Sequence, residues 1–291
     1  MSAERTLAPF GRRLAPITAA ERHGAYVVLR CPDLDGPEPR PGQFYMLAAS
    51  AGWGGGESER PFLPRAFSVL RAIPDPATGV ELQFLVEDVG PGTKRLSELA
   101  AGDGLLLVGP LGTGFAPPRE GRRPLLVGGG VGIAPLAIWQ DRLGPGVPVL
   151  VGFRDAAHAA GAGLLTGARV ATDDGSVGHH GLVTELLGPE LGRAGSEFEV
   201  YACGPPAMLE AVRLLCAEHG APAQLALESG MACGFGACFG CVVPTRHGYL
   251  RLCVEGPVLD AAVLEEAALV GHGDRSASPH SGPHISAPEQ R

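Results

Sequence analysis

Short apolar runs separated by polar, turn-forming segments fill the first hundred or so residues. Strands that follow one another at such intervals are typical of a barrel or a sandwich. The polar, glycine-rich stretch 51–59 predicts a surface loop. Residues 1–118 are therefore expected to form an N-terminal antiparallel β-barrel. Its strands are predicted at 25–31, 43–48, 65–70, 80–86 and 105–109.

Beyond residue 118, short apolar runs alternate with longer segments that predict helices. Strands that alternate with helices indicate a parallel sheet covered by helices. Residues 119–224 are therefore expected to form a Rossmann-like parallel α/β domain. Its strands are predicted at 124–128, 147–153, 168–172 and 199–203, and its helices at 133–143 and 206–218.

The last part of the chain differs from both domains. Residues 225–265 carry four of the seven cysteines and predict a small C-terminal module. Residues 266–291 are dominated by Gly, Ser, Pro and His, a composition that buries too little apolar surface to fold. This tail is expected to be disordered. Its histidines could bind a metal, but a solvated tail is the favoured interpretation.

Length and charge narrow the class of protein. With 291 residues, 45% of them hydrophobic, the chain can form two domains and a small third module. The net charge of −8 disfavours nucleic acid as a partner, because duplex binding needs a basic surface. No signal peptide and no apolar run of membrane-spanning length are found. An odd number of cysteines disfavours a disulfide framework and favours a reducing, cytoplasmic location.

The cysteine motif is the strongest chemical signal in the chain. Cys233, Cys238 and Cys241 form a C-x4-C-x2-C triplet, and eleven residues separate it from Cys253. This is the spacing of plant-type [2Fe–2S] ligands. Glycine and alanine fill most of the positions inside the triplet, so the loop can wrap closely around a cluster. A structural zinc site and ordinary buried thiols are the alternatives.

A glycine-rich loop follows the predicted strand 124–128 and precedes the predicted helix 133–143. Glycines let the backbone approach a pyrophosphate, and the helix N-terminus offers free N–H groups. The loop departs from the G-x-G-x-x-G pattern, so a tight structural turn is the alternative. The glycines expected to contact a dinucleotide are Gly128, Gly129, Gly130 and Gly132.

The segment 201–208 (Tyr-Ala-Cys-Gly-Pro-Pro-Ala-Met) places a thiol at a strand end, just before a helix. Together with the glycine loop, it resembles the nicotinamide-binding half of the ferredoxin–NADP reductase superfamily. The resemblance implies that Cys203, with Gly204 and Pro205, lies near the reactive nicotinamide ring. A buried sheet thiol is the alternative for Cys203.

In the barrel, the segment 65–68 (Arg-Ala-Phe-Ser) is similar to the flavin signature R-x-[YF]-S of the same superfamily. Arg65 is suited to a pyrophosphate as a bidentate cation. Ser68 can hydrogen-bond the isoalloxazine edge, and the phenylalanine offers an aromatic face. Gly92 and Thr93 fit a second phosphate cradle. A plain strand with a surface arginine is the alternative.

The order of the motifs is more specific than any one of them. The flavin signature is followed by glycine-rich segments at 109–115 and 128–135, by Thr-Asp-Asp-Gly-Ser at 172–176, and by the cysteine segment 228–241. Over roughly residues 14–262, this order resembles the electron-transfer subunit of class 1B dihydroorotate dehydrogenase. The resemblance implies FAD in the barrel, NAD on the glycine loop and one [2Fe–2S] cluster. It implies an oxidoreductase of pyrimidine (UMP) biosynthesis.

The same resemblance implies a partner, an FMN-containing dihydroorotate dehydrogenase catalytic subunit, in a heterotetramer of two copies of each. It assigns the cluster to the four cysteines. Four features depart from the family pattern: the short gap before Cys253, the aromatic residue at 67, the insertion 51–59 and the His-containing tail. The FAD contacts that the resemblance implies are Arg65, Ala66, Phe67, Ser68, Leu85, Val86, Glu87, Gly92 and Thr93.

Other functions share these modules. One alternative is the reductase subunit of another assembly, such as a soluble hydrogenase or a ferredoxin-dependent NADP oxidoreductase. An alternative of a different class is a non-catalytic, zinc-stabilised binding module. Arg154 could bind a 2′-phosphate, and Asp155 could accept a hydrogen bond from a ribose hydroxyl. These residues therefore do not decide whether the chain uses NAD or NADP. No acid–base pair or nucleophile stands out, as expected where the redox chemistry belongs to cofactors.

Overall fold

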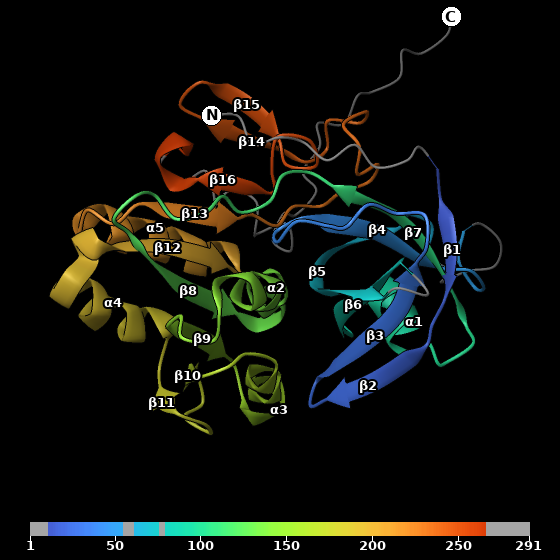
Figure 1. The fold of residues 1–291 in the computed structure, drawn as a ribbon, viewed down its shortest axis with the longest axis horizontal. Helices are drawn as coiled ribbons and strands as arrows, with labels where there is room; N and C mark the ends of the chain where they lie inside the picture. The colour runs from blue at the N-terminus through green and yellow to red at the C-terminus, as the bar shows by residue number, and fades with distance from the viewer. Residues whose placement is uncertain (1–10, 55–60, 76–78, 266–291) are drawn as a thin grey trace, which may run out of the picture.

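The computed structural model describes residues 11–54, 61–75 and 79–265. Two seven-stranded sheets form two lobes side by side, and a two-stranded hairpin lies above the left-hand lobe in the view of Figure 1. The predicted tail 266–291 and much of the predicted loop 51–59 lie outside the described residues. The prediction of a barrel joined to an α/β domain is confirmed.

The first lobe is an antiparallel barrel. Its strand order is β1-β7-β4-β5-β6-β3-β2, and only two residues separate β1 from β2, so the two ends of the sheet meet and the barrel closes. The predicted strands are present, whereas β1, β2 and the short helix α1 were not predicted. The elements are β1 (Arg13–Pro16), β2 (Ala19–His23), β3 (Tyr26–Asp33), β4 (Phe44–Ala49), β5 (Arg65–Asp75), β6 (Gly79–Glu87), α1 (Pro91–Ser97) and β7 (Gly104–Leu111).

A buried ion pair closes the barrel between β1 and β3. Arg13 donates to both carboxylate oxygens of Asp33 at 2.7 Å, and Tyr45 on β4 donates to the same carboxylate at 3.2 Å. Asp33 is almost fully buried, so this charge is stabilised only because Arg13 and Tyr45 satisfy it. Removing any of the three would leave a polar group of the barrel interior unsatisfied.

The second lobe is a sheet in the order β11-β10-β9-β8-β12-β13-β16, parallel except for β16. The chain fills one half from β8 outward to β11 and then crosses to β12, so the order reverses between β8 and β12. Its strands are β8 (Arg123–Gly129), β9 (Val149–Phe153), β10 (Ala168–Thr172), β11 (His179–His180), β12 (Phe198–Cys203), β13 (Ala223–Ala226) and β16 (Val258–Asp260).

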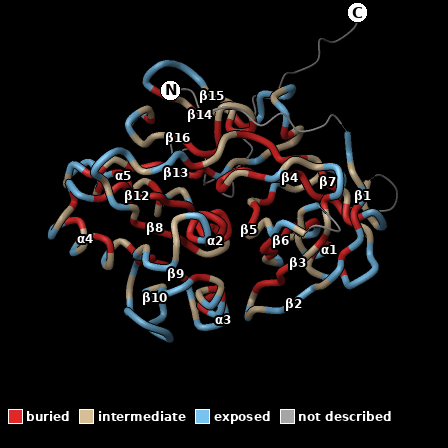
Figure 2. Tube along the Cα trace, in the orientation of Figure 1, coloured by how far each residue is buried: buried red, intermediate tan, exposed pale blue. Residues whose placement is uncertain are grey.

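Helices cover both faces of this sheet. The helix α2 lies between the sheet and the barrel and is buried along most of its length (Figure 2). The helices α2 and α5 were predicted, whereas α4 was not, because Gly188, Pro189 and Gly192 break its helical pattern. The helices are α2 (Ile133–Leu143), α3 (Ala156–Ala159), α4 (Val183–Ala194) and α5 (Pro206–Glu218), with 3₁₀ turns η1 (Gly130–Gly132), η2 (Ala160–Leu164), η3 (Gly195–Glu197) and η4 (Ala261–Val263).

The cysteine segment is an excursion from the α/β sheet. The boundary predicted at residue 224 falls inside β13, and the chain returns to pair β16 antiparallel with β13. Between them lie the cysteine loop and the hairpin of β14 (Val242–Thr245) and β15 (Gly248–Arg251). The segment also docks on the barrel, where the Thr113 N–H donates to the Gly256 carbonyl oxygen at 2.5 Å. In the described part of the chain, no helix is long and apolar enough to cross a membrane.

Candidate functional site

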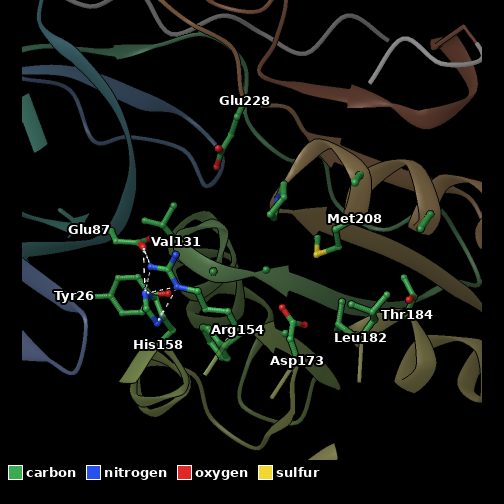
Figure 3. Close-up of a pocket in the computed structure, with 18 residues that line it drawn as sticks. Tyr26, Glu87, Val131, Arg154, His158, Asp173, Leu182, Thr184, Met208 and Glu228 are labelled. Atoms are coloured by element: carbon green, nitrogen blue, oxygen red, sulfur yellow. Dashed lines mark hydrogen bonds and ion pairs between the residues drawn. The ribbon is translucent and has the colours of Figure 1, made fainter. Parts of the chain in front are cut away.

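Two cavities lie where the barrel meets the α/β sheet. The larger one, of about 710 Å³, borders β5 and is named the barrel cavity. The smaller one, of about 450 Å³, lies beyond the carboxyl ends of β8, β9, β10 and β12 and is named the sheet cavity (Figure 3). Glu87, Val131 and Glu228 line both cavities. The two cavities therefore share one wall, and ligands in them would lie next to each other.

The predicted flavin signature lines the barrel cavity. All four residues of the segment 65–68 contribute to its wall, together with Leu85 and Glu87 on β6. Side chains alternate across a strand, so Val86 between them points into the barrel core and is fully buried. The side chain of Val86, which was predicted to contact FAD, therefore does not line the cavity.

Arg65 offers this cavity a cation. Its Nη1 donates to the Leu63 carbonyl oxygen at 2.6 Å, and a Cβ added to Gly92 would lie 2.7 Å from its Nε. Among the described residues it pairs with no carboxylate, which leaves its charge available to a phosphate. Thr93 also lines the cavity, but its hydroxyl donates to the Gly90 carbonyl oxygen at 3.0 Å and accepts from the Val89 N–H at 2.9 Å, so it is already engaged by the backbone before α1. Gly92 lies behind Arg65 and not in the cavity wall.

The glycine loop lies where the strand order of the sheet reverses, which is the usual ligand position in such sheets. Gly128 at the end of β8 pairs with Cys203 at the end of β12. A Cβ on Gly132 would lie 2.5 Å from the Cys203 carbonyl oxygen, so only glycine permits this close approach. Gly129 and Gly130 line the sheet cavity, and α2 starts there without a side-chain cap. The free N–H groups can bind a pyrophosphate.

Cys203, at the end of β12, lines neither of the two cavities. Its side chain is 2% exposed, and burial raises the pKa of its thiol well above the ordinary value, with the Glu228 carboxylate adding to the rise. Pro205 lines the sheet cavity, whereas Gly204 is covered by Met208. The structure thus brings Cys203 to the expected strand end as a neutral, packed thiol.

Glu228 was not predicted as a site residue. Its side chain is exposed to the two cavities at their shared wall. Surrounding protein atoms desolvate its carboxyl, and the nearby Glu87 carboxylate repels its charge; both effects raise its pKa. A carboxyl with a raised pKa next to two ligand cavities can hold a proton there. The one signal in the sequence that could have identified Glu228 as a site residue is its position at the start of the cysteine segment.

A network of charged side chains closes the barrel side of the sheet cavity (Figure 3). Arg154 at the end of β9 donates to Glu87 of the barrel at 2.8 Å and to His158 at 3.0 Å. His158 contacts Asp155 at 2.6 Å and meets the ring of Tyr26 edge-on at 5.6 Å. Tyr26 lines the cavity, and its buried hydroxyl finds no hydrogen-bond partner among the described residues.

The four predicted cluster cysteines come together as two pairs. The Cys241 and Cys253 thiols are 3.2 Å apart and buried beneath the hairpin. Cys233 and Cys238 form the second pair, in which Cys238 donates hydrogen bonds to the Cys233 sulfur through its backbone and side chain. In the loop between them, Gly234 has a left-handed φ of 79° and lies against Met46 of the barrel. Only glycine adopts this conformation there without strain.

The donor set fits a two-iron cluster better than a single ion. In the described residues no group of three His, Cys, Asp or Glu side chains is close enough to hold one metal ion. Two thiol pairs suit a [2Fe–2S] centre, in which each iron takes two cysteines. Desolvation opposes ionisation of Cys233, but hydrogen bonds from the Cys238 and Phe235 backbones outweigh it and lower its pKa to about 6. The thiolate that a cluster needs is therefore accessible.

The segment that leads into the cysteine loop is also part of the barrel cavity. Residues 227–232 line that cavity, and the next residue is Cys233. The sheet cavity, the barrel cavity and the cysteine pairs therefore follow one another without a gap. Sequence reasoning missed this segment, and it missed Asp173 and Leu182 in the sheet cavity, because their positions depend on how the lobes meet.

Comparison with known proteins agrees with this arrangement. Residues 228–265 match the iron–sulfur cluster binding domain of dihydroorotate dehydrogenase B. The electron transfer subunit of dihydroorotate dehydrogenase B (NAD(+)) from Clostridium acetobutylicum is 36% identical over 225 residues, which cover 76% of this chain and 84% of the relative. The corresponding subunit from Geobacillus thermodenitrificans is 37% identical, with 76% and 85% covered. The chain belongs to this family of electron-transfer subunits.

Solved structures place the family on a reductase scaffold. An NADH-dependent reduced ferredoxin-NADP oxidoreductase is similar with a TM-score of 0.70 and 25% identity, over 90% of this chain and 94% of that one. A ferredoxin NADP+ reductase from Neisseria gonorrhoeae, with bound FAD and NADP, shares the fold at a TM-score of 0.54 and 20% identity, over 72% and 92% of the two chains. The matched iron–sulfur domain contains all four cysteines of the two pairs.

Proposed function

We propose that this electron-transfer subunit carries electrons between NAD and a separate, FMN-containing dihydroorotate dehydrogenase catalytic subunit, in pyrimidine biosynthesis. A flavin bound in the barrel cavity would supply the chemistry that links two-electron to one-electron transfer. One observation carries the proposal, namely the continuity of the two cavities and the cysteine loop. Glu228 lies at the first junction, and Met231 with Ala232 lies at the second.

The residues of the chain bind and position these groups. Arg65 holds a flavin phosphate in the barrel cavity, and the glycine loop with the N-terminus of α2 holds the dinucleotide pyrophosphate. Cys203 packs behind the shared wall and keeps water out of it. Glu228 lies at the wall that the two cavities share, where desolvation and the nearby Glu87 carboxylate raise its pKa. No nucleophile is needed, because the protein supplies geometry and electrostatics to cofactor chemistry.

The catalytic subunit docks, in this proposal, over the exposed side of the cysteine loop. Phe235 and Phe239 are 53% and 60% exposed there, on either side of Cys238, and Arg251 stacks on Phe239 at 5.1 Å. Exposed aromatic residues beside an arginine are typical of the centre of an interface. The assembly is a heterotetramer of two copies of each subunit. It is cytoplasmic, in keeping with seven cysteines of which none is paired in a disulfide in the described structure.

Coexpression with the FMN-containing subunit tests the proposal. The complex should catalyse NAD-dependent oxidation of dihydroorotate, and the isolated chain should be yellow-brown and bleach with NADH. Phe239→Asp should abolish the coupled reaction and leave NADH bleaching unchanged. Leu14→Asp on β1, which is 65% exposed on the barrel, is the matched control and should change neither. No complex, or no dihydroorotate oxidation by a complex that forms, would contradict the proposal.

A second candidate shares the scaffold, a ferredoxin-dependent NADP oxidoreductase subunit. It is supported by the TM-score of 0.70 to the NADH-dependent reduced ferredoxin-NADP oxidoreductase over 90% of the chain. The same purified chain, supplied with reduced ferredoxin in place of the catalytic subunit, would then reduce a nicotinamide dinucleotide. The identities of 31% to 37% to dihydroorotate dehydrogenase B subunits favour the first candidate.

A further inference from the structure

The adenosine end of the sheet cavity can be located from its walls. Glu87 and Glu228 mark the end that adjoins the flavin, and the glycine loop marks the centre. The remaining wall comes from the ends of β9 and β10 and the start of α4, and includes Asp173, Leu182 and Thr184. These residues lie on the far side of the cavity from Glu228 (Figure 3). A dinucleotide with its nicotinamide at the flavin therefore has its adenosine here.

The turn after β10 fixes Asp173 in this wall. The Thr172 hydroxyl is buried, accepts from the Val177 N–H at 3.0 Å and donates to the Val177 carbonyl oxygen at 2.9 Å. The Asp173 N–H donates to the Phe153 carbonyl oxygen at 2.9 Å, which ties the turn to β9. The Asp173 carboxylate itself has no hydrogen bond or ion pair with any described residue. It is a free acceptor that faces the cavity.

Leu182, in the same wall of the cavity, provides an apolar contact. It precedes α4, lines the cavity and is 58% exposed. An adenine ring stacked on Leu182 would bury this surface. The ribose would then lie between Leu182 and Asp173, with its hydroxyls within reach of the carboxylate.

No free cation balances the carboxylates of this cavity. Glu87, Asp173 and Glu228 line it, and Arg154 is the one lysine or arginine among the described lining residues. Arg154 is already engaged by Glu87 at 2.8 Å and by His158. A 2′-phosphate would add about two negative charges beside Asp173 without a partner, because phosphate monoesters are largely dianionic at neutral pH.

We propose that Asp173 is the residue that selects NAD over NADP, by accepting a hydrogen bond from a ribose hydroxyl and repelling a 2′-phosphate. The inference rests on the proposed function in one respect, that the sheet cavity takes a nicotinamide dinucleotide. It gives a role to the Thr-Asp-Asp-Gly-Ser segment 172–176, which no other part of the mechanism uses. Arg154, considered from the sequence as a 2′-phosphate ligand, serves instead to join β9 to the barrel.

The test compares Asp173→Asn with Asp174→Asn in the full, cofactor-loaded chain. Asp174 carries the same charge one residue later, but it accepts from the Ser176 N–H at 3.0 Å and does not line the cavity. Flavin bleaching by NADH and by NADPH is followed at each concentration to obtain kcat/KM. The wild type should prefer NADH, and Asp173→Asn should raise the NADPH-to-NADH ratio at least about tenfold, as expected when a like charge a few ångströms away is removed. Asp174→Asn should leave the ratio within about twofold, because its charge is farther off and screened.

Calorimetry supplies a readout that does not depend on redox activity. The wild type should bind 5′-AMP more tightly than adenosine 2′,5′-bisphosphate, and Asp173→Asn should abolish this difference. A wild type that uses NADPH as well as NADH, or an unchanged ratio and unchanged nucleotide preference in Asp173→Asn, would overturn the inference. If neither dinucleotide bleaches the flavin, the proposed function fails, while the nucleotide preference still decides the role of Asp173.

Discussion

The glycine loop and the cysteine loop are both rich in small residues, but they are held in place by different means. The glycine loop runs directly from β8 into α2, and its ends are buried in the sheet. The cysteine loop lies between Leu227 and Val242, where no residue belongs to a helix or a strand. Its two phenylalanines are more than half exposed. Packing therefore shapes the first loop, whereas the second depends on what its thiols bind.

This difference has a consequence for each ligand. A loop that packing has already shaped can bind and release a dinucleotide at little cost in ordering. A loop whose conformation is coupled to metal binding loses its structure when the metal leaves, because binding and folding free energy are then the same quantity. The chain thus places an exchangeable substrate on the packed loop and a permanent cluster on the loop that needs it.

The largest effect is expected from removal of a buried cluster ligand. Cys241→Ala breaks the pair with Cys253, 3.2 Å away, and should abolish the visible and electron-paramagnetic signals of the cluster. Electron transfer to the catalytic subunit should fall to background, while NADH still bleaches the flavin, because the glycine loop is intact. The control is Cys216→Ala in α5, a thiol that is equally buried but outside the cluster. A cluster that survives Cys241→Ala would contradict the assignment of ligands.

Intermediate effects are expected at the glycines, and they distinguish the two loops. Gly132→Ala would bring a Cβ within 2.5 Å of the Cys203 carbonyl oxygen, and backbone cannot move aside. We expect a loss of about 2–3 kcal/mol of stability from this overlap, with much weaker reduction of the flavin by NADH. The matched control is Gly192→Ala in α4, where nothing lies within 4 Å of the added Cβ and no proline follows; it should stabilise the chain by up to about 1 kcal/mol.

Gly234→Ala makes the corresponding change in the cysteine loop. The added Cβ would meet Met46 at 2.5 Å, but a methionine side chain can move, unlike the carbonyl beside Gly132. The remaining cost is the left-handed φ of 79°, about 1–2 kcal/mol for a residue with a side chain. In chemical denaturation, Gly132→Ala should therefore lose more unfolding free energy than Gly234→Ala. The reverse order would show that the cysteine loop is the more tightly packed of the two.

The sequence predicted the regular elements of both lobes well where one local pattern decided them. The helices α2 and α5 begin and end where their patterns predicted, and the strand that leads to Cys203 differs by one residue. The helix α4 was missed because its glycines and Pro189 are local signals against helix, and packing of Leu187 and Leu191 overrides them. Local signals were thus sufficient to predict elements whose residues favour them, but not a helix such as α4, which packing stabilises against its local signals.

The residues of the candidate site also fall into two groups, those that a local motif predicts and those that depend on the tertiary structure. Cluster ligands and the flavin signature could be predicted because each is a short motif within one element. Asp173, Leu182 and Glu228 could not, because each becomes a site residue only when three separate parts of the chain meet at the cavities. Val86 shows a further limit of motifs: a motif covers consecutive residues, whereas a strand turns alternate side chains away, so the side chain of Val86 is buried in the barrel.

The smallest effect is expected where the two loops meet, at Glu228. Its pKa is raised in the folded protein above the ordinary value of 4.5, by desolvation and by Glu87, so the folded state disfavours the carboxylate. This cost is absent below the ordinary pKa and grows as the pH rises through the folded value. Glu228→Gln should therefore be more stable than the wild type at pH 7 to 8, by about 1–3 °C in Tm for a chain of this size. The gain should shrink as the pH is lowered toward 5.

Thermal unfolding of both proteins across this pH range measures the difference. Glu185→Gln is the control of opposite sign, because a hydrogen bond from His179 lowers the pKa of that carboxyl and so favours its charged form. Glu185→Gln should be less stable than the wild type at neutral pH, and the loss should shrink in acid. If the Glu228→Gln difference does not vary with pH, the carboxyl carries no titrating cost. Packing alone would then hold Glu228 in the shared wall, as packing holds the glycine loop.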